Sequence, residues 1–401
     1  MGRGGNEIDP RRLLYGEPLV SRLDRRVAPA GLETVFPEEL FGAGELISAT
    51  LGGESYAATV DGPAGRRFLF SRRGQPSELR VLPDELSAPQ GPFEHQSLPD
   101  NLDMFLWKDE EEDEWNVMTC SDNGDPGLRM GYSSLVGNSE YSLTTIKGFP
   151  GLAWIELRGS DGLCLQEADK RSPKDPAMVV SSYPCDVSGE TDNVKAIYNP
   201  RGAEIIAVWS EAEGGQVRIR SWGSQTGTET IALYPGDQPA RIEDLQLQDD
   251  EPVFTFSTGE EGGSLVYAHG EFLKMGPGHG VPKIIACTDG RILSARRSVG
   301  ELLVEEISGF ESGLEPKEVA RISNVDDYEL TGKSKPKLIY KRGGKNPLIM
   351  RVDLDGVWER PLAELDAGDL LGATTDNSGK TTALVLDRSS DRPQVISLED
   401  H

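Results

Sequence analysis

The sequence has few of the residues that build most metal and redox sites. It contains four cysteines and four histidines in 401 residues. The cysteines form no C-x-x-C pair, so the sequence predicts neither a zinc site nor a dithiol redox motif. We expect no metal and no cofactor, and reduced thiols in a cytoplasmic protein. If the chain is a mature exported protein, a disulfide between Cys164 and Cys185 is the alternative.

Long apolar runs and an excess of basic residues are also missing. No apolar run approaches the length of a transmembrane helix, and no signal-peptide pattern begins the sequence. Lys and Arg total 41 against 67 Asp and Glu, which gives a formal net charge of −26. Such a charge repels phosphate backbones, so we expect no nucleic-acid partner and no membrane partner. The sequence predicts an acidic, soluble monomer.

Helical periodicity is almost absent, and only residues 31–41 suggest one short helix. Instead, a strand–turn–strand unit recurs with 46 glycines and 26 prolines available for its turns. The clearest copy begins at Asn193 and reads NVKAIYNPRG, AEIIAVWSEAEGG, QVRIRSWGSQTG, TETIALYPGD. A spacing of about 45 residues between copies is typical of a four-stranded β-propeller blade.

The second strand of each unit gives the best alignment of the copies. These strands are predicted to begin at Ser55, Asp103, Leu152, Glu204, Pro252, Arg291, Lys337 and Thr381. The fold prediction is all-β: a single β-propeller of about eight four-stranded blades over residues 1–401. Seven blades is the alternative count because the second and third units are the least regular, and a pair of β-sandwiches is the alternative architecture.

The last unit has three strands before the sequence ends at His401. A propeller that leaves one blade short exposes a strand edge, so a strand from the N-terminal part of the chain should complete it. Residues 17–23 (EPLVSRL) are the predicted closing strand, and residues 1–16 a loose arm.

Residues 199–210 (NPRGAEIIAVWS) resemble the S-P-D-G-x-x-I-A-F-x-S repeat of TolB-type propellers, which also builds the N-terminal propeller of prolyl oligopeptidases. Residues 376–386 (DNSGKTTALVL) are a looser copy. The pattern departs at Arg201, where Asp is usual. The resemblance implies a propeller of this type and does not specify an activity.

A serine hydrolase of the prolyl-oligopeptidase type is not expected. The repeats occupy almost the whole sequence and leave no room in it for an α/β-hydrolase domain. The nucleophile elbow G-x-S-x-G is missing as well: the segment 131–135 (GYSSL) has Leu135 where the second glycine must permit the tight turn.

Charge is divided among the predicted hairpin tips between second and third strands, which share one face of a propeller. Acidic tips come from the second, fourth and fifth units, and basic tips from the sixth to eighth. The predicted binding residues are Asp109, Glu110, Glu111, Glu112, Asp113, Glu211, Glu260, Arg296, Arg342 and Arg388. This pattern favours electrostatic docking of a protein or peptide partner.

Two histidines are the candidates for catalysis. His279 lies in GPGHG before a first strand, and His95 lies in the candidate first strand PFEHQSL. Histidine is a natural general acid–base at neutral pH. The leading functional prediction is a non-catalytic binding scaffold. The alternative is a lyase, isomerase or hydrolase that uses His279 or His95 on a small molecule at the channel mouth.

Overall fold

In the computed structural model, the described residues form an array of antiparallel β-strands with one short helix. It describes residues 31–399 with gaps in the connections. The gaps of four residues or more are 74–77, 81–87, 110–113, 122–128, 145–151, 169–180, 183–189, 258–262, 344–347 and 389–393. The described strands form eight sheets, numbered here in chain order.

The first four sheets use strands β2 to β18. Sheet 1 contains β2 (Glu45–Gly52), β3 (Ser55–Gly62), β4 (Gly65–Arg72) and β5 (Glu78–Arg80). Sheet 2 contains β6 (Glu94–Leu98), β7 (Leu102–Asp109), β8 (Glu114–Ser121) and β9 (Arg129–Leu135). Sheet 3 contains β10 (Ser139–Thr144), β11 (Leu152–Arg158), β12 (Gly162–Ala168) and β13 (Ser181–Ser182). Sheet 4 contains β14 (Glu190–Thr191), β15 (Lys195–Asn199), β16 (Glu204–Glu213), β17 (Gln216–Gly223) and β18 (Gly227–Pro235).

The remaining sheets use the later strands and β1. Sheet 5 contains β19 (Arg241–Gln248), β20 (Glu251–Ser257), β21 (Ser264–Ala268) and β22 (Glu271–Lys274). Sheet 6 contains β23 (His279–Ala286), β24 (Ile292–Ser298), β25 (Glu301–Phe310) and β26 (Gly313–Ser323). Sheet 7 contains β27 (Val325–Thr331), β28 (Lys337–Arg342), β29 (Leu348–Asp353) and β30 (Trp358–Glu364). Sheet 8 contains β31 (Asp369–Thr375), β32 (Thr381–Asp387), β33 (Gln394–Glu399) and β1 (Gly31–Phe36).

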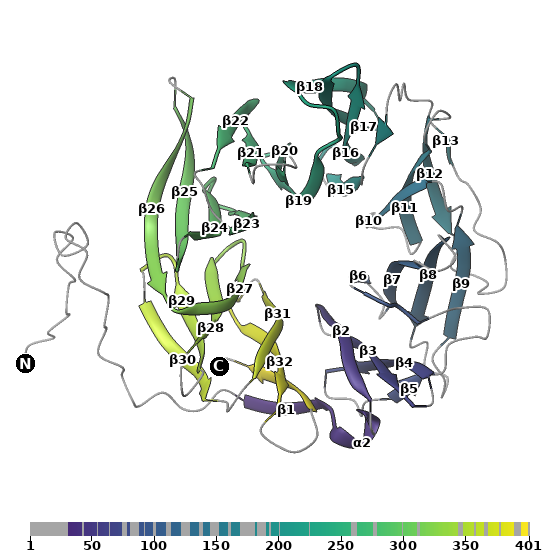
Figure 1. Cartoon of the computed structure of the whole chain (residues 1–401), viewed down its shortest axis with the longest axis vertical. Helices are drawn as coiled ribbons and strands as arrows, with labels where there is room; N and C mark the ends of the chain where they lie inside the picture. Colours follow the sequence, from purple (N-terminus) through teal and green to yellow (C-terminus); the bar gives the residue numbers. More distant parts are fainter. Residues whose placement is uncertain are drawn as a thin grey trace, which may run out of the picture.

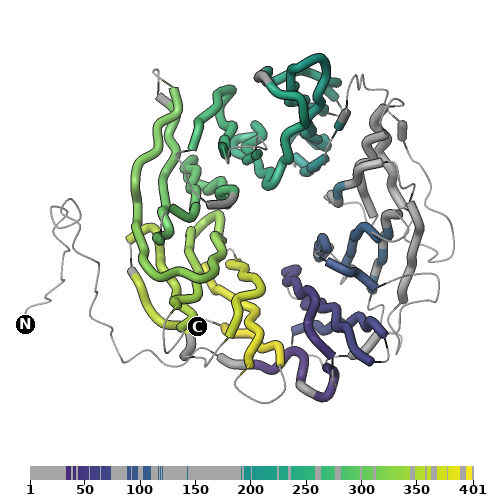
Figure 2. Tube along the Cα trace, viewed as in Figure 1, coloured from purple at the N-terminus to yellow at the C-terminus, as the bar shows by residue number. Residues whose placement is uncertain are grey.

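The sheets stand in a ring, with the first strand of each innermost (Figure 1). Inner strands β15, β19, β23, β27, β31, β2 and β6 each contact the next one in that order. Figure 2 shows the chain following the ring from the purple sheet 1 to the yellow sheet 8. This arrangement is a β-propeller, as the sequence predicted.

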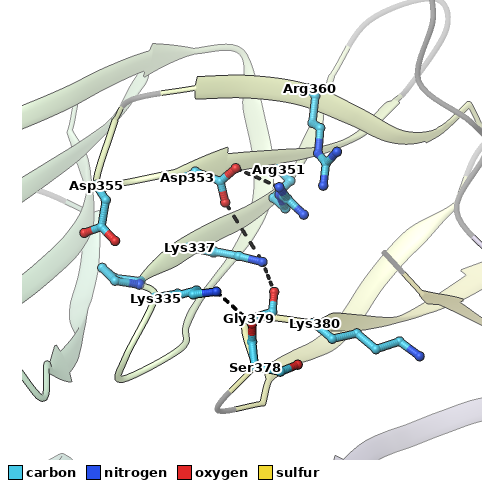
Figure 3. A pocket seen from close by; sticks show the side chains of 10 residues that line it. Lys335, Lys337, Arg351, Asp353, Asp355, Arg360, Ser378, Gly379 and Lys380 are labelled. Carbon is cyan, nitrogen blue, oxygen red and sulfur yellow. Dashed lines mark hydrogen bonds and ion pairs between the residues drawn. The ribbon is translucent and has the colours of Figure 1, made fainter. Parts of the chain in front are cut away.

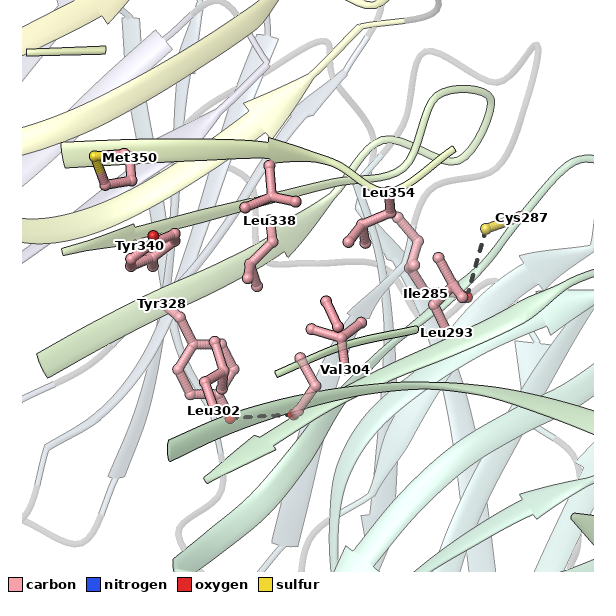
Figure 4. Close-up of a cluster of buried hydrophobic side chains, with 13 residues drawn as sticks. Ile285, Cys287, Leu293, Leu302, Val304, Tyr328, Leu338, Tyr340, Met350 and Leu354 are labelled. Atoms are coloured by element: carbon pink, nitrogen blue, oxygen red, sulfur yellow. Dashed lines mark hydrogen bonds between the residues drawn. The ribbon is translucent and has the colours of Figure 1, made fainter. Parts of the chain in front are cut away.

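The core lies between neighbouring sheets. Strand β16 is buried at eight consecutive positions, so both of its faces are covered. Figure 4 shows the cluster between sheets 6 and 7, where Leu293 and Val304 meet Leu338 and Met350. Burial of both sheet faces explains why the second strands read as nearly continuous apolar runs.

The predicted starts of the second strands are confirmed to within one residue. Strands β3, β11, β16, β28 and β32 begin at the predicted residues, and β7, β20 and β24 begin one residue away. The prediction that residues 1–401 form one domain stays a prediction.

The N-terminal strand is in a different place from the one predicted. Residues 17–23 lie outside the described residues, as does the predicted arm 1–16. The fourth strand of sheet 8 is β1, which pairs antiparallel with β33 through Leu32 and Leu398. The helix predicted for residues 31–41 is therefore wrong over its first half: only α2 (Glu38–Phe41) is helical. Backbone pairing with β33 and burial of Val35 and Phe36 outweigh local helix propensity there.

The described part of the chain has no helix long and apolar enough to cross a membrane.

The antiparallel order of the strands defines two faces of the ring. Turns between second and third strands lie on one face, called here the upper face. Turns between first and second strands, and between third and fourth, lie on the lower face.

Candidate binding site

Two of the acidic residues predicted at exposed tips are buried. Asp109 is 3% exposed and Glu211 is fully buried. Strand β16 continues to Glu213, so its tip is formed by two glycines with positive φ, Gly214 and Gly215, and not by Glu211. Inside the sheet, Glu211 accepts a hydrogen bond of 2.9 Å from the indole nitrogen of Trp209. The predicted exposure of Asp109 and Glu211 is wrong.

The other acidic binding residues cannot be placed. Glu110, Glu111, Glu112, Asp113 and Glu260 lie outside the described residues. An acidic half of the upper face therefore stays a prediction.

The basic residues predicted on the upper face bind acidic neighbours within the ring. Arg296 is buried, not exposed as predicted, because its guanidinium bonds both carboxylate oxygens of Glu305 at 3.0 and 3.4 Å. Arg342 is half-buried and donates to Tyr340 and Glu359. Arg388 is exposed, with its Nε 3.2 Å from the carboxylate of Asp369. Only Arg388 of these three presents a largely exposed charge.

His95 is enclosed between sheets 1 and 2. Its side chain is fully buried and stacks on Phe105, with ring centroids 4.5 Å apart. Its Nε2 lies 3.1 Å from the hydroxyl of Ser55 and 3.2 Å from the carboxylate of Asp103. Gly52 is needed beside it, since an added Cβ would lie 2.6 Å from Nε2. In this position the ring has no exposed surface, and its role in catalysis stays a prediction.

The Ser–His–Asp group lacks the order of a catalytic triad. In a triad, the serine and the carboxylate bind opposite ring nitrogens. Here both lie at Nε2 of His95, and Nδ1 has no hydrogen-bond partner among the described residues. Asp103 also accepts from Ser97 at 2.7 Å and from Arg72. Burial raises the pKa of Asp103, but the hydrogen bonds from His95, Ser55 and Ser97 outweigh it and leave that pKa below its usual value. These hydrogen bonds join sheet 1, through Ser55, to sheet 2, through His95 and Asp103.

His279 is the first residue of β23, where its backbone is in register with Arg297. Because Arg297 is near the end of the second strand, His279 lies toward the upper face, as predicted. Its role in catalysis stays a prediction.

Cys120 and Cys287 are free and buried. The possible Cys164–Cys185 disulfide lies outside what the structure describes. Within the described residues no group of three or more His, Cys, Asp or Glu side chains is arranged to hold a metal ion.

A cavity of about 520 Å³ opens on the lower face between sheets 7 and 8 (Figure 3). Its lining comes from the β27–β28 turn, strands β28, β29 and β30, the β29–β30 turn, and the β31–β32 turn. The lining residues are Lys335, Pro336, Lys337, Arg351, Asp353, Asp355, Arg360, Ser378, Gly379 and Lys380. Five are cationic and two anionic, so this is a basic site in an acidic protein. We call it the basic cavity.

Lys337 is the most enclosed amine of the basic cavity, with a side chain only 6% exposed. It donates to the Gly379 carbonyl and, at 3.0 Å, to the Thr381 hydroxyl, and its Nζ lies 4.0 Å from Asp353. Burial first, and then the positive charge of Arg351, lower its pKa to about 8, although Asp353 opposes them. The low pKa therefore reports mainly how deeply the amine is enclosed.

The remaining charges of the basic cavity are bonded in different directions. Arg351 donates to Asp353 at 2.7 Å, while Lys335 donates to the Ser378 carbonyl at 2.9 Å. Lys380 is drawn away to Glu399, a residue outside the lining, at 2.8 Å. Asp355 is likewise bonded outside the lining, to Arg291 at 2.5 Å.

The basic cavity was not predicted from the sequence, because only the charges of the upper tips were compared. The signal was the lysine-rich turn GKSKPK at residues 332–337, which connects a first and a second strand. Comparing the lower turns in the same way would have identified it.

No family model and no curated protein matches this sequence. Several solved structures have a similar fold. A prolyl endopeptidase aligns with 88% of this chain and 56% of its own at 10% identity and a TM-score of 0.49. Oligopeptidase B from Leishmania major aligns with 87% of this chain and 54% of its own at 8% identity and a TM-score of 0.48. The WD40 repeats of RRP9 align with 93% of this chain and 98% of their own at 10% identity and a TM-score of 0.43.

The chain thus spans little more than half the length of the two peptidases that it matches. Two of the similar structures are therefore peptidases whose names include this propeller-bearing class. At these identities the likeness concerns fold alone.

Proposed function

We propose that this protein is a binding propeller that recognises an acidic segment of a protein partner at the basic cavity. The observation that carries the proposal is the charge of the lining. Five cationic and two anionic side chains surround one cavity in a chain of net charge −26. A local positive site in a negative protein attracts an anionic group at short range and repels a large polyanion at long range.

Binding is favoured over catalysis by the chemistry of the lining. The lining includes no histidine and no cysteine. Its two carboxylates bond arginines, Asp353 to Arg351 and Asp355 to Arg291. Lys337, the lining group with a pKa close to neutral, donates to Gly379 and Thr381. Charge that is already fixed in this way suits recognition of an anion more than proton transfer.

The size of the cavity suits a short peptide segment. A volume of about 520 Å³ falls within the range of small-molecule and peptide side-chain pockets. Hydrogen bonds already hold Lys335, Lys337 and Arg351 in place, which reduces the ordering cost of binding.

The test is fluorescence anisotropy with a labelled glutamate-rich peptide and the same peptide carrying glutamine. We expect binding of the acidic peptide only, weakened severalfold between about 50 and 500 mM salt as charges are screened. The variant Lys335→Gln/Arg360→Gln should weaken binding at least about tenfold, because charge-assisted hydrogen bonds are lost.

The matched control is Lys333→Gln. Lys333 is exposed on the same turn as Lys335 and does not line the basic cavity. It is compared with Lys335→Gln alone, which removes the same single charge, as well as with the double variant. Equal weakening by Lys333→Gln and by the cavity variant, or equal binding of the two peptides, would refute the proposal.

A further inference from the structure

We propose that the basic cavity contains a phosphoryl subsite formed by Lys337, Arg351 and Arg360, which takes a phosphorylated side chain of the partner. The inference rests on the proposed function and specifies the chemical group that the cavity selects.

The strand register places these three cations on one face of sheet 7. Arg351 and Arg360 are direct cross-strand partners in β29 and β30, and Lys337 is the partner of Asp353 in β28 and β29. Residues 351 and 353 are two apart and therefore share a face. The four residues thus form a square of three cations and one anion, turned toward the β31–β32 turn of sheet 8.

Two arginines directly opposite each other are unfavourable in a sheet unless an anion compensates them. Asp353 supplies one negative charge and lies beside both Arg351 and Lys337. Burial first, and then the charge of Arg351, lower the pKa of Arg360. Within the square, the three cations outnumber the one carboxylate of Asp353, so the formal charge of the square is positive. An entering dianion relieves this repulsion better than a monoanion does.

The donor chemistry also favours a phosphoryl group. A guanidinium presents a planar fork of donors that bonds phosphate oxygens in pairs, and an ammonium adds a point charge. A phosphorylated side chain carries about −1.5 to −2 charges and three strong acceptor oxygens at pH 7. A glutamate carries one charge and two oxygens, so it can satisfy fewer of these donors.

Figure 3 shows where such a group would enter. The charged ends of Lys337, Arg351 and Arg360 turn toward a common space, while Lys380 extends away from it and Asp355 lies on the far side. The cavity volume of about 520 Å³ exceeds the space that one phosphoryl group needs. The excess leaves room for the residues that flank the phosphorylated position, which is why we assign the group to a peptide and not to a free ion.

The experiment compares three peptides of one sequence, with phosphoserine, glutamate or serine at the central position, by isothermal titration calorimetry. We expect the phosphoserine peptide to bind at least about tenfold more tightly than the glutamate peptide, and the serine peptide most weakly. Inorganic phosphate alone should bind more weakly than the phosphoserine peptide and compete with it.

Variants locate the subsite. Arg360→Gln should remove most of the preference for phosphoserine over glutamate, and Arg360→Lys, which keeps the charge but loses the fork, should remove part of it. Lys333→Gln should leave the preference unchanged. Thermal unfolding of each variant checks that it remains folded.

The outcomes separate the two proposals. Tight but equal binding of the phosphoserine and glutamate peptides overturns the phosphoryl subsite and leaves the proposed function intact. No binding of either peptide overturns both. If inorganic phosphate binds as tightly as the phosphoserine peptide, the assignment to a phosphorylated protein is overturned in favour of free phosphate. If Arg360→Gln leaves the preference for phosphoserine over glutamate unchanged, the phosphoryl subsite is not formed by Arg360 and its assigned location is overturned.

Discussion

The amine of Lys337 donates a 3.0 Å hydrogen bond to the hydroxyl of Thr381 and thereby joins sheets 7 and 8 at the basic cavity. Each residue begins the second strand of its sheet. Sheets 1 and 2 are joined in a similar way: Ser55, the first residue of β3, donates a hydrogen bond to Asp103, the second residue of β7. The start of the second strand is therefore a position where neighbouring sheets are tied together by side chains, and its chemistry differs around the ring.

The stability of the protein should report the low pKa of Lys337. Its pKa is about 8 in the folded chain, owing to burial and to Arg351, Arg360 and Lys335, and about 10.4 in an unfolded chain. Between these values the unfolded chain binds more protons, so folding gains stability as pH rises. The unfolding free energy of wild type should therefore rise relative to that of Lys337→Met by on the order of 1–2 kcal/mol from pH 8 to 10.5. Urea unfolding measures it.

Lys333→Met is the control for the Lys337 prediction, because Lys333 is exposed on the same turn. Its difference from wild type should stay flat over the same pH range. A flat difference for Lys337→Met as well would mean that Lys337 titrates normally.

The buried Arg296–Glu305 pair should be costly to break from one side. Arg296→Met leaves the Glu305 carboxylate buried, and we expect a loss of about 3 kcal/mol. Arg296→Met/Glu305→Leu should be less destabilised than the single variant, because no charge is stranded. Arg388→Met, at the exposed pair with Asp369, should cost less than about 1 kcal/mol. Urea unfolding of the three variants at neutral pH tests this order, and a double variant worse than the single one contradicts it.

Asp103→Asn should destabilise the protein by about 2–4 kcal/mol at pH 7, because an amide cannot replace a carboxylate that accepts from Ser55, Ser97 and Arg72. The folded pKa of Asp103 lies below its unfolded value, so its contribution is fully present above about pH 4 and is lost as pH falls through the folded pKa. The gap between wild type and Asp103→Asn should therefore shrink in acid. A gap that is constant down to pH 3 in denaturant titrations would show that the Asp103 charge contributes nothing.

Much of the fold could be predicted from the sequence, because each second strand is an apolar run between turn residues. Glu204–Glu213 is the clearest case: both of its faces are buried, and its limits are set by local turn chemistry. The N-terminal strand could not be located in this way. Both 17–23 and Gly31–Phe36 have a suitable pattern, and only the pairing with β33 decides between them.

The candidate site was harder to predict because exposure depends on where a strand ends. Glu211 and Arg296 both follow an apolar run and were expected at solvent-exposed tips, yet each lies inside its sheet beside a partner of opposite charge. The square of Lys337, Arg351, Arg360 and Asp353 combines three strands and is invisible without the register. Sequence reasoning found the charged turns but not which charges face one another.

The pairing of β1 with β33 predicts which part of the N-terminal region holds the propeller together. Deletion of residues 1–30 keeps every described strand, so the urea midpoint should change little. Deletion of residues 1–36 removes buried Val35 and Phe36 and exposes the edge of β33, so it should cause a large loss of stability and aggregation.

Point variants within β1 separate packing from mere chain length. Phe36→Ala, at a fully buried side chain, should cost about 3–4 kcal/mol, while Thr34→Ala, at an exposed position of the same strand, should cost less than about 0.5 kcal/mol. If deletion of residues 1–30 is as damaging as deletion of residues 1–36, the closing function belongs to an earlier segment such as 17–23. If Phe36→Ala is harmless, β1 does not contribute to the core between sheets 8 and 1, and the pairing with β33 alone holds it in place.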